Sequence, residues 1–163
     1  MKSNGKDTYL KFGNNHDVVE KVVLCYEKWR DQPADLVAQL RELSPEEQCY
    51  AIFRYVIDNV HYKVDKPGYQ YIKSPARLLD DAEGDCKSMT LFIASCLHCL
   101  GISHVIRFVN FDGGSQYTHV YPIAVMPTGD IIILDAVERD AQQKPVYNYA
   151  RDYRKKLEIY YKE

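Results

Sequence analysis

The chain has 163 residues, 46% of them hydrophobic, which is enough for one sizeable core and too little for two separate domains. Its 21 basic and 23 acidic residues are scattered and give a net charge of −2, which argues against nucleic acid or an anionic membrane as a partner. Met1 to Phe12 contains no apolar targeting segment, and no run approaches the roughly 18 apolar residues of a membrane span. We therefore expect one cytoplasmic domain whose five cysteines, an odd number, are reduced thiols.

The N-terminal third of the sequence predicts helices. Residues 1–15 are polar and rich in glycine and asparagine, so we expect a loose N-terminal arm. From Asp17 to Trp29 apolar residues recur at helical spacing, and a second, short helix is expected from Asp35 to Leu43. Ser44 then caps a third helix, because Pro45 follows it and two glutamates occupy the first turn.

The middle of the chain leads to a cysteine. His61–Val64 alternates briefly and predicts a short extended segment, and Gly68–Gly84 is loop-like with a short turn or helix opened by Ser74-Pro75. After Gly84-Asp85-Cys86, apolar residues recur at helical spacing until Gly101. Because these apolar residues surround most of the circumference, they predict a helix that starts at the cysteine and is buried on most sides.

The spacing changes from helical to alternating in the last third of the chain. Three strands are expected at residues 105–111, 117–126 and 130–137, joined by short turns that contain glycine. Short turns between successive strands imply an antiparallel meander. Tyr147–Tyr161 mixes aromatic and charged residues, and we expect a C-terminal helix there.

Cys86 occupies a place that favours the anionic form of its side chain. Asp85 is a good N-cap residue, which leaves the Cys86 sulfur in the first turn, where unpaired N–H groups and the helix dipole attract negative charge. These features favour a thiolate, the reactive form of cysteine. The remaining cysteines lack such a setting and are interpreted as packing residues: Cys25, Cys49, Cys96 and Cys99.

Polar residues interrupt two of the predicted strands. His119 lies in the second strand and Asp135 in the third, so in a hairpin they would lie roughly opposite each other. A carboxylate could then hold the imidazole ring, and packing on the Cys86 helix would assemble a nucleophile, a base and an orienting acid. Taken singly, His119 could be a satisfied strand histidine and Asp135 the cap of a strand end.

The order and spacing of these residues resemble a known family. Gly84-Asp85-Cys86, an apolar helix, a strand with His119 and a strand ending in Leu134-Asp135 are similar to the transglutaminase-like superfamily of papain-fold cysteine enzymes, especially its compact bacterial and phage members. Phe53–Tyr62 resembles the helix-then-tyrosine segment of that family, and Ser74–Leu79 resembles the loop before its nucleophile.

The resemblance covers about residues 45–137 and implies an α+β fold, papain-like, in which N-terminal helices and a buried central helix pack on an antiparallel sheet. On this view residues 1–163 form one transglutaminase-like domain with a catalytic triad of Cys86, His119 and Asp135. Papain-like enzymes hold the oxyanion with the nucleophile's own N–H and a second donor. Candidates for that second donor are Gln70, Tyr71 and Tyr62.

The leading hypothesis is cysteine-dependent acyl transfer, by hydrolysis of a peptide or amide bond in a peptide or protein substrate through a thioacyl-enzyme. Protein crosslinking through a lysine amine and a noncatalytic interaction domain that keeps the fold are the alternatives. Cys96 and Cys99 with His104 invite a zinc interpretation, but no second pair of ligands completes a site at zinc spacing. We therefore expect no metal and no cofactor.

Overall fold

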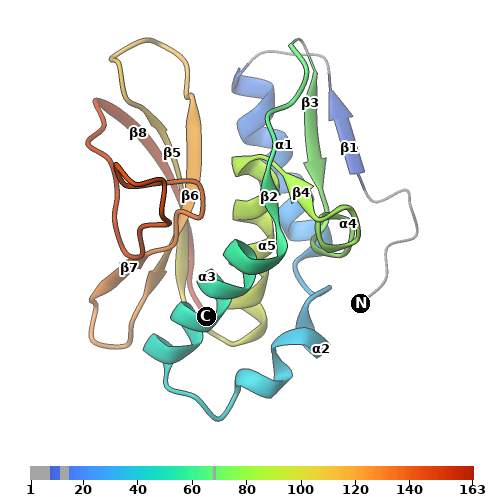
Figure 1. The fold of residues 1–163 in the computed structure, drawn as a ribbon, viewed down its shortest axis with the longest axis vertical. Helices are drawn as coiled ribbons and strands as arrows, with labels where there is room; N and C mark the ends of the chain where they lie inside the picture. The colour runs from blue at the N-terminus through green and yellow to red at the C-terminus, as the bar shows by residue number, and fades with distance from the viewer. Residues whose placement is uncertain (1–7, 12–14, 68) are drawn as a thin grey trace.

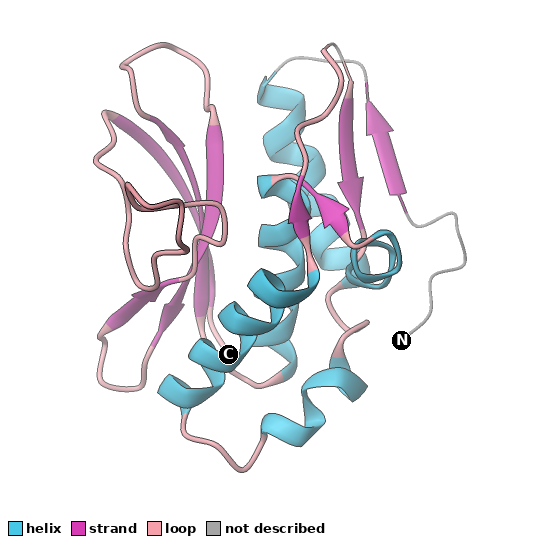
Figure 2. Ribbon diagram, viewed as in Figure 1, coloured by secondary structure: helices cyan, strands magenta, loops and turns pink. Residues whose placement is uncertain are grey.

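The computed structural model describes residues 8–11, 15–67 and 69–163, and Figure 1 shows how they are arranged. A four-stranded antiparallel sheet forms one layer, helices form the middle, and two small two-stranded sheets lie on the opposite side of the helices. Figure 2 distinguishes these helices and strands by colour. The predicted α+β class, in which helices pack on an antiparallel sheet, is confirmed.

The helices agree with most of the sequence-based expectations. The third predicted helix begins at Ser44, whose hydroxyl accepts the N–H of Glu47 while the Glu47 carboxylate accepts the N–H of Ser44. The second predicted helix is shorter than expected and ends in a 3-10 turn at Ala38–Leu40. The helices are α1 (Asn15–Trp29), α2 (Ala34–Val37), α3 (Pro45–Asn59), α4 (Pro75–Asp81) and α5 (Cys86–Cys99).

The main sheet contains the predicted meander. Its strand order is β7-β6-β5-β8, and every neighbouring pair is antiparallel. The three strands predicted in the last third of the chain are therefore confirmed, although the third is only three residues long. The strands are β5 (His104–Asn110), β6 (His119–Val125), β7 (Ile131–Ile133) and β8 (Lys155–Tyr161).

The helix expected at Tyr147–Tyr161 is wrong, because β8 occupies the last part of that segment and pairs with β5. Leu157, Ile159 and Tyr161 are two residues apart and pack against the same core cluster, which is the periodicity of a strand. Local sequence alone did not show that β5 has a free edge to which this segment could be added.

The small sheets correct two further expectations. Thr8–Lys11, within the segment predicted to be a loose arm, forms β1 and pairs antiparallel with β3 (Gln70–Lys73); residues 1–7 and 12–14 lie outside the described residues. The predicted extended segment is β2 (His61–Tyr62), which pairs parallel with β4 (Glu83–Gly84). The loop-like segment before Cys86 therefore contains two strands that were not predicted, β3 and β4, together with α4, which follows Ser74 as predicted.

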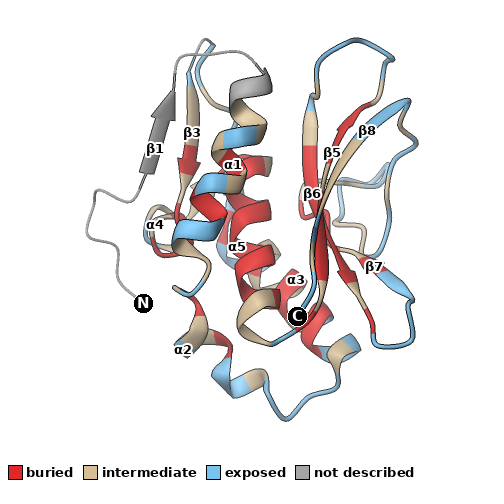
Figure 3. Ribbon diagram, turned by 180° about the vertical axis from the view of Figure 1, so that it is seen from behind, coloured by how far each residue is buried: buried red, intermediate tan, exposed pale blue. Residues whose placement is uncertain are grey.

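Helix α5 is the centre of the molecule, and Figure 3 shows it buried along most of its length. Every residue from Lys87 to Leu97 is buried, as the apolar circumference of this segment predicts. The helix separates two apolar clusters, one with α3 and one with α1, and both include residues of the main sheet. None of the described helices combines the length and the apolar character that crossing a membrane requires.

Candidate active site

Cys86 is the first residue of α5, and the local sequence fixes it there. The Asp85 carboxylate caps the helix by accepting the N–H groups of Lys87 at 3.0 Å and Ser88 at 3.4 Å. A Cβ atom on Gly84 would lie 2.5 Å from the Cδ1 atom of fully buried Leu78, so only glycine fits before the cap. Cys86 itself stays partly exposed at the start of the helix.

His119 and Asp135 meet as the sequence predicts, but not as directly opposed residues. Nε2 of His119 lies 2.7 Å from Oδ2 of Asp135, a buried carboxylate with 2% exposure. The pairing of Ile123 with Ile133, continued by two residues, would set Tyr121 opposite Asp135. Asp135 lies just beyond the end of β7 and is therefore a diagonal neighbour of His119. Side chains of diagonal neighbours on adjacent antiparallel strands are close enough to make contact.

The Cys86 side chain lies close enough to the His119 ring to contribute, through hydrogen bonding and charge, to the pKa of that ring. Since Nε2 is held by Asp135, the other ring nitrogen, Nδ1, is left for the thiol. Burial alone would lower the pKa of His119, but the hydrogen bonds and negative charges of Asp135 and Cys86 outweigh burial and raise this pKa to about 10. At neutral pH the ring is therefore an imidazolium beside the sulfur of Cys86.

These residues open into a cleft of about 340 Å³, within the range of pockets that bind small ligands or peptide side chains. The lining comes from the segment between β2 and β3, which forms one wall, from the start of α5, and from α1, β5 and the start of β6. The lining residues are Val18, Tyr62, Val64, Asp65, Lys66, Pro67, Tyr69, Gln70, Asp85, Cys86, Lys87, Phe108, Tyr117, Thr118, His119 and Val120.

Two of the three candidates for the second oxyanion donor line this cleft. Tyr62 and Gln70 do so, whereas Tyr71 is not among the described residues that line it, and its N–H donates to Asp65 instead. Burial, followed by the negative charges of Cys86 and Asp85, raises the pKa of Tyr62. The Tyr62 hydroxyl is therefore close enough to the Cys86 sulfur to interact with it electrostatically.

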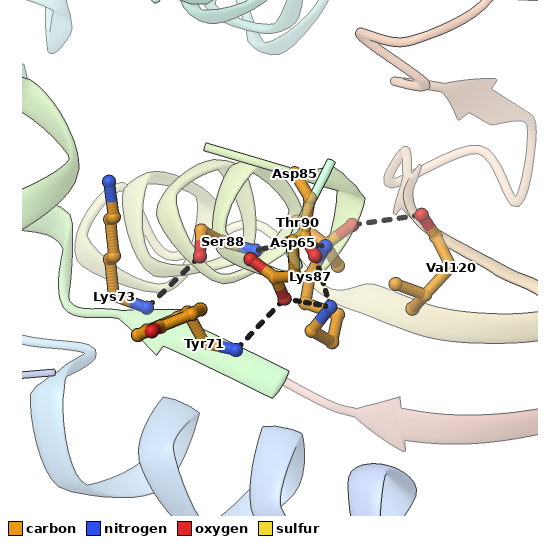
Figure 4. Close-up of polar contacts among 8 residues, drawn as sticks. All are labelled: Asp65, Tyr71, Lys73, Asp85, Lys87, Ser88, Thr90 and Val120. Atoms are coloured by element: carbon orange, nitrogen blue, oxygen red, sulfur yellow. Dashed lines mark hydrogen bonds and ion pairs between the residues drawn. The ribbon is translucent and has the colours of Figure 1, made fainter. Parts of the chain in front are cut away.

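A buried ionic cluster that the sequence patterns did not predict lies beside Cys86 (Figure 4). The Lys87 ammonium contacts the carboxylates of Asp85 and Asp65, and Asp65 comes from the cleft wall between β2 and β3. A signal was present, because Lys87 is a charged residue at the start of a helix that is otherwise apolar around much of its circumference.

The other thiols have environments that suit packing. Burial raises the pKa of Cys25 to about 11, of Cys49 to about 12 and of Cys99 to about 11, and it also raises the pKa of Cys96. These four thiols therefore stay protonated at neutral pH.

The side chains that were considered as possible zinc ligands make other contacts. Nε2 of His104 lies 2.6 Å from the Tyr26 hydroxyl, and the thiol of Cys99 donates to the carbonyl oxygen of Arg30 at 3.2 Å. Within residues 8–11, 15–67 and 69–163, no group of three or more His, Cys, Asp or Glu side chains could hold a metal ion.

A cysteine at the start of a buried helix, with a histidine on an adjacent antiparallel sheet and an acid just beyond the end of one of its strands, is the arrangement of the papain-like class of cysteine-enzyme folds. A family model described as a transglutaminase-like domain matches residues 32–161, and the chain belongs to this family. None of the curated protein sequences matches the chain.

Solved structures share the fold at low sequence identity. LapG of Legionella pneumophila has a TM-score of 0.53 at 17% identity, over 83% of this chain and 76% of LapG. A protein of Parabacteroides distasonis that is provisionally assigned as a protease has a TM-score of 0.57 at 13% identity, over 76% of this chain and 26% of that protein. A provisionally assigned cysteine protease of Cytophaga hutchinsonii has a TM-score of 0.49 at 14% identity, over 82% of this chain. The chain spans 48% of the length of the Cytophaga protein.

Proposed function

We propose that this protein is a cysteine hydrolase that cleaves a peptide or amide bond in a peptide or protein substrate, with Cys86, His119 and Asp135 as its triad. The observation that carries the proposal is the 2.7 Å contact between the Asp135 carboxylate and the His119 ring, which lines an open cleft together with Cys86. The provisional assignment of the Parabacteroides protein as a protease supports the same class of reaction.

In the first half of the reaction, the Cys86 thiolate attacks the substrate carbonyl carbon and forms a C–S bond, while the carbonyl electrons move to oxygen. The N–H of Cys86 is in the first turn of α5 and stabilises this oxyanion. When the tetrahedral intermediate collapses, the C–N bond breaks and the His119 imidazolium gives its proton to the leaving amine. This step leaves a thioacyl-enzyme and a neutral His119.

In the second half, neutral His119 takes a proton from water as the water oxygen attacks the thioester carbon. Collapse of that intermediate breaks the C–S bond, releases a carboxylic acid and restores the thiolate and imidazolium. Asp135 keeps Nδ1 of the ring directed at sulfur in both halves, because it holds Nε2 at 2.7 Å. A lysine amine in place of water would give crosslinking by the same steps.

The test joins thiol reactivity with turnover. Iodoacetamide at neutral and acidic pH, followed by mapping of the modified residues, should label Cys86 far faster than the four other cysteines, whose pKa values are raised by burial. Incubation with a peptide library and mass spectrometry should then detect cleavage by the unmodified protein that is lost in Cys86→Ala and kept in Cys99→Ala.

Each alternative function predicts a different outcome of this experiment. Incorporation of a fluorescent primary amine into protein, without peptide cleavage, would assign crosslinking in place of hydrolysis. Equal labelling of all five cysteines, with no turnover of either kind, would favour a noncatalytic domain and overturn the proposal.

A further inference from the structure

Lys87, the residue after the nucleophile, points its charged end into the protein rather than into solvent. The residue is 7% exposed, and a lysine is almost never this buried without partners. Its Nζ contacts a carboxylate oxygen of Asp85 and lies 3.0 Å from Oδ2 of Asp65 (Figure 4). The steps proposed above for Cys86 and His119 do not use this ammonium.

Asp65 connects Lys87 to the wall of the cleft. Its Oδ2 atom accepts from Nζ of Lys87 at 3.0 Å and from the N–H of Tyr71 at 2.9 Å, so one carboxylate oxygen joins the start of α5 to β3 (Figure 4). The residues on either side of Asp65 line the cleft but are exposed, and Val64 is 68% exposed. Apolar packing therefore contributes little to holding this wall in place.

We propose that Lys87 is a positioning residue for the proposed hydrolysis: its ammonium tethers the cleft wall Val64–Pro67, through Asp65, to the first turn of the helix that carries Cys86. A peptide substrate that lies between this wall and β6 is then held at a fixed distance from the Cys86 sulfur. The role rests on the proposed function, because it concerns how the substrate is placed for attack by Cys86.

The charges explain why a cation is needed at this point. Without the ammonium, the carboxylates of Asp65 and Asp85 would face each other in a partly buried space and repel. Burial works against the charge of Lys87, but Asp85, Cys86 and Asp65 outweigh burial and raise the pKa of Lys87. Burial and the charge of Asp65 raise the pKa of Asp85 to about 6 although Lys87 opposes them, so Asp85 is mostly ionised at neutral pH beside the charged Lys87.

Lys73, whose side chain is 15% exposed against 9% for Lys87, supplies a matched control. Nζ of Lys73 lies 2.9 Å from the Asp81 carboxylate and 2.8 Å from the carbonyl oxygen of Glu83, so it also joins two segments of the chain. Among the residues that the structure describes, those that line the cleft do not include Lys73. Lys73→Met removes an ammonium of similar burial without touching the wall or the nucleophile.

The experiment compares two alkylating probes on each variant, so that it does not depend on turnover. Iodoacetamide reports the reactivity of Cys86 alone, and acetyl-Ala-Ala-Phe chloromethyl ketone reports the same sulfur with a peptide placed in the cleft. The ratio of the two second-order rate constants should fall by about tenfold or more in Asp65→Asn and in Lys87→Met, because a misplaced wall misaligns only the peptide. Lys73→Met should keep the wild-type ratio.

Two further variants separate a tether from a general structural role. Lys87→Arg keeps a cation that can reach both carboxylates and should restore most of the ratio. The double variant Lys87→Met with Asp65→Asn should lose no more than either single variant, since both single changes break the same contact. Circular-dichroism melting checks that each variant is folded, and Asp65→Asn decides the outcome if Lys87→Met does not fold.

Three results would overturn the role of Lys87: a ratio within twofold of wild type in folded Asp65→Asn, an equal fall in both rate constants, or the same loss in Lys73→Met. A wild-type Cys86 that iodoacetamide labels no faster than the other thiols is a separate result, which overturns the proposed function itself and with it the need for a tether.

Discussion

The side chain of His119 lies between a carboxylate and a thiol with only 9% of its surface exposed, and this setting determines its charge. Burial disfavours the charged ring, yet the contacts with Asp135 and Cys86 raise the pKa of His119 to about 10. A neutral imidazole in the same place could not donate a proton to a leaving amine. Asp135 thus contributes to both the orientation of the ring and its protonation state.

Asp135→Asn should move the alkaline limb of the pH–rate profile to lower pH. In the unchanged protein, activity should fall as pH rises through about 10, because His119 then loses the proton that the leaving group needs. The amide keeps the size of the carboxylate but removes its charge, which takes away the main contributions that raise the pKa of His119. Initial rates of cleavage of one peptide, measured from pH 6 to pH 11, would give the pH at which activity falls on the alkaline side of the profile.

The same substitution should change how stability depends on pH. A histidine with a pKa raised from about 6.5 to about 10 stabilises the fold fully below the lower value, and this stabilisation is lost as pH rises through the upper value. Asp135→Asn should flatten the dependence in that window, which urea unfolding at several pH values would reveal. An unchanged alkaline limb and an unchanged stability profile would show that Asp135 does not control the charge of His119.

Helix α5 acts as a common attachment for the elements that surround the cleft. Within four residues after Cys86, Lys87 binds the wall at Asp65, the Ser88 hydroxyl accepts the N–H of Lys73 in β3 at 3.0 Å, and Thr90 donates to β6 (Figure 4). Each contact joins the nucleophile's helix to a different strand or loop. The geometry of the cleft therefore depends on polar contacts at one end of a helix whose remaining surface is mostly apolar.

Thr90→Val should reduce activity more than it reduces stability. The Thr90 hydroxyl donates to the carbonyl oxygen of Val120 at 3.1 Å, and Val120 directly follows His119 in β6. Loss of this bond should cost about 1 kcal/mol of unfolding free energy. Because it frees the backbone next to the general acid, kcat should fall by about tenfold or more. Thr90→Ser keeps the hydroxyl and should retain activity; equal kcat values for Thr90→Val and Thr90→Ser would contradict this role.

At the scale of the whole molecule, the sequence predicts the parts whose signals are local. Helix α5 follows from an apolar circumference after a capping residue, and the meander from alternating residues between short turns. The contact of His119 with Asp135 is predicted because a hairpin brings neighbouring strands together. The catalytic role of these residues stays a prediction.

The remaining parts depend on pairing between distant segments, which local patterns do not contain. Strand β8 forms because β5, about fifty residues earlier in the chain, offers it an edge, and β1 pairs with β3 across most of the N-terminal half. The contact of Lys87 with Asp65 spans 22 residues and joins a helix to a loop, so the sequence marks Lys87 as unusual but does not reveal its partner. Such contacts become visible only once the chain has folded.

Catalysis and folding can be separated by comparing two substitutions in α5. Cys86→Ala replaces one small, partly exposed side chain by another at the start of the helix, so it should abolish turnover and change the unfolding free energy by no more than about 1 kcal/mol. Leu97→Ala removes a fully buried side chain from the cluster between α3, α5 and the main sheet. The cavity should cost roughly 2–5 kcal/mol, and activity should be lost only as the molecule unfolds.

The two substitutions should therefore separate when activity and folding are measured on the same samples across a urea titration. For Leu97→Ala the activity per folded molecule should equal that of the unchanged protein, while its unfolding midpoint moves to lower urea. For Cys86→Ala the midpoint should stay close to the original, and activity should be absent even without urea. Turnover by Cys86→Ala at the unchanged rate would mean that the nucleophile is another group, and a large loss of stability in that variant would mean that the thiol is part of the core.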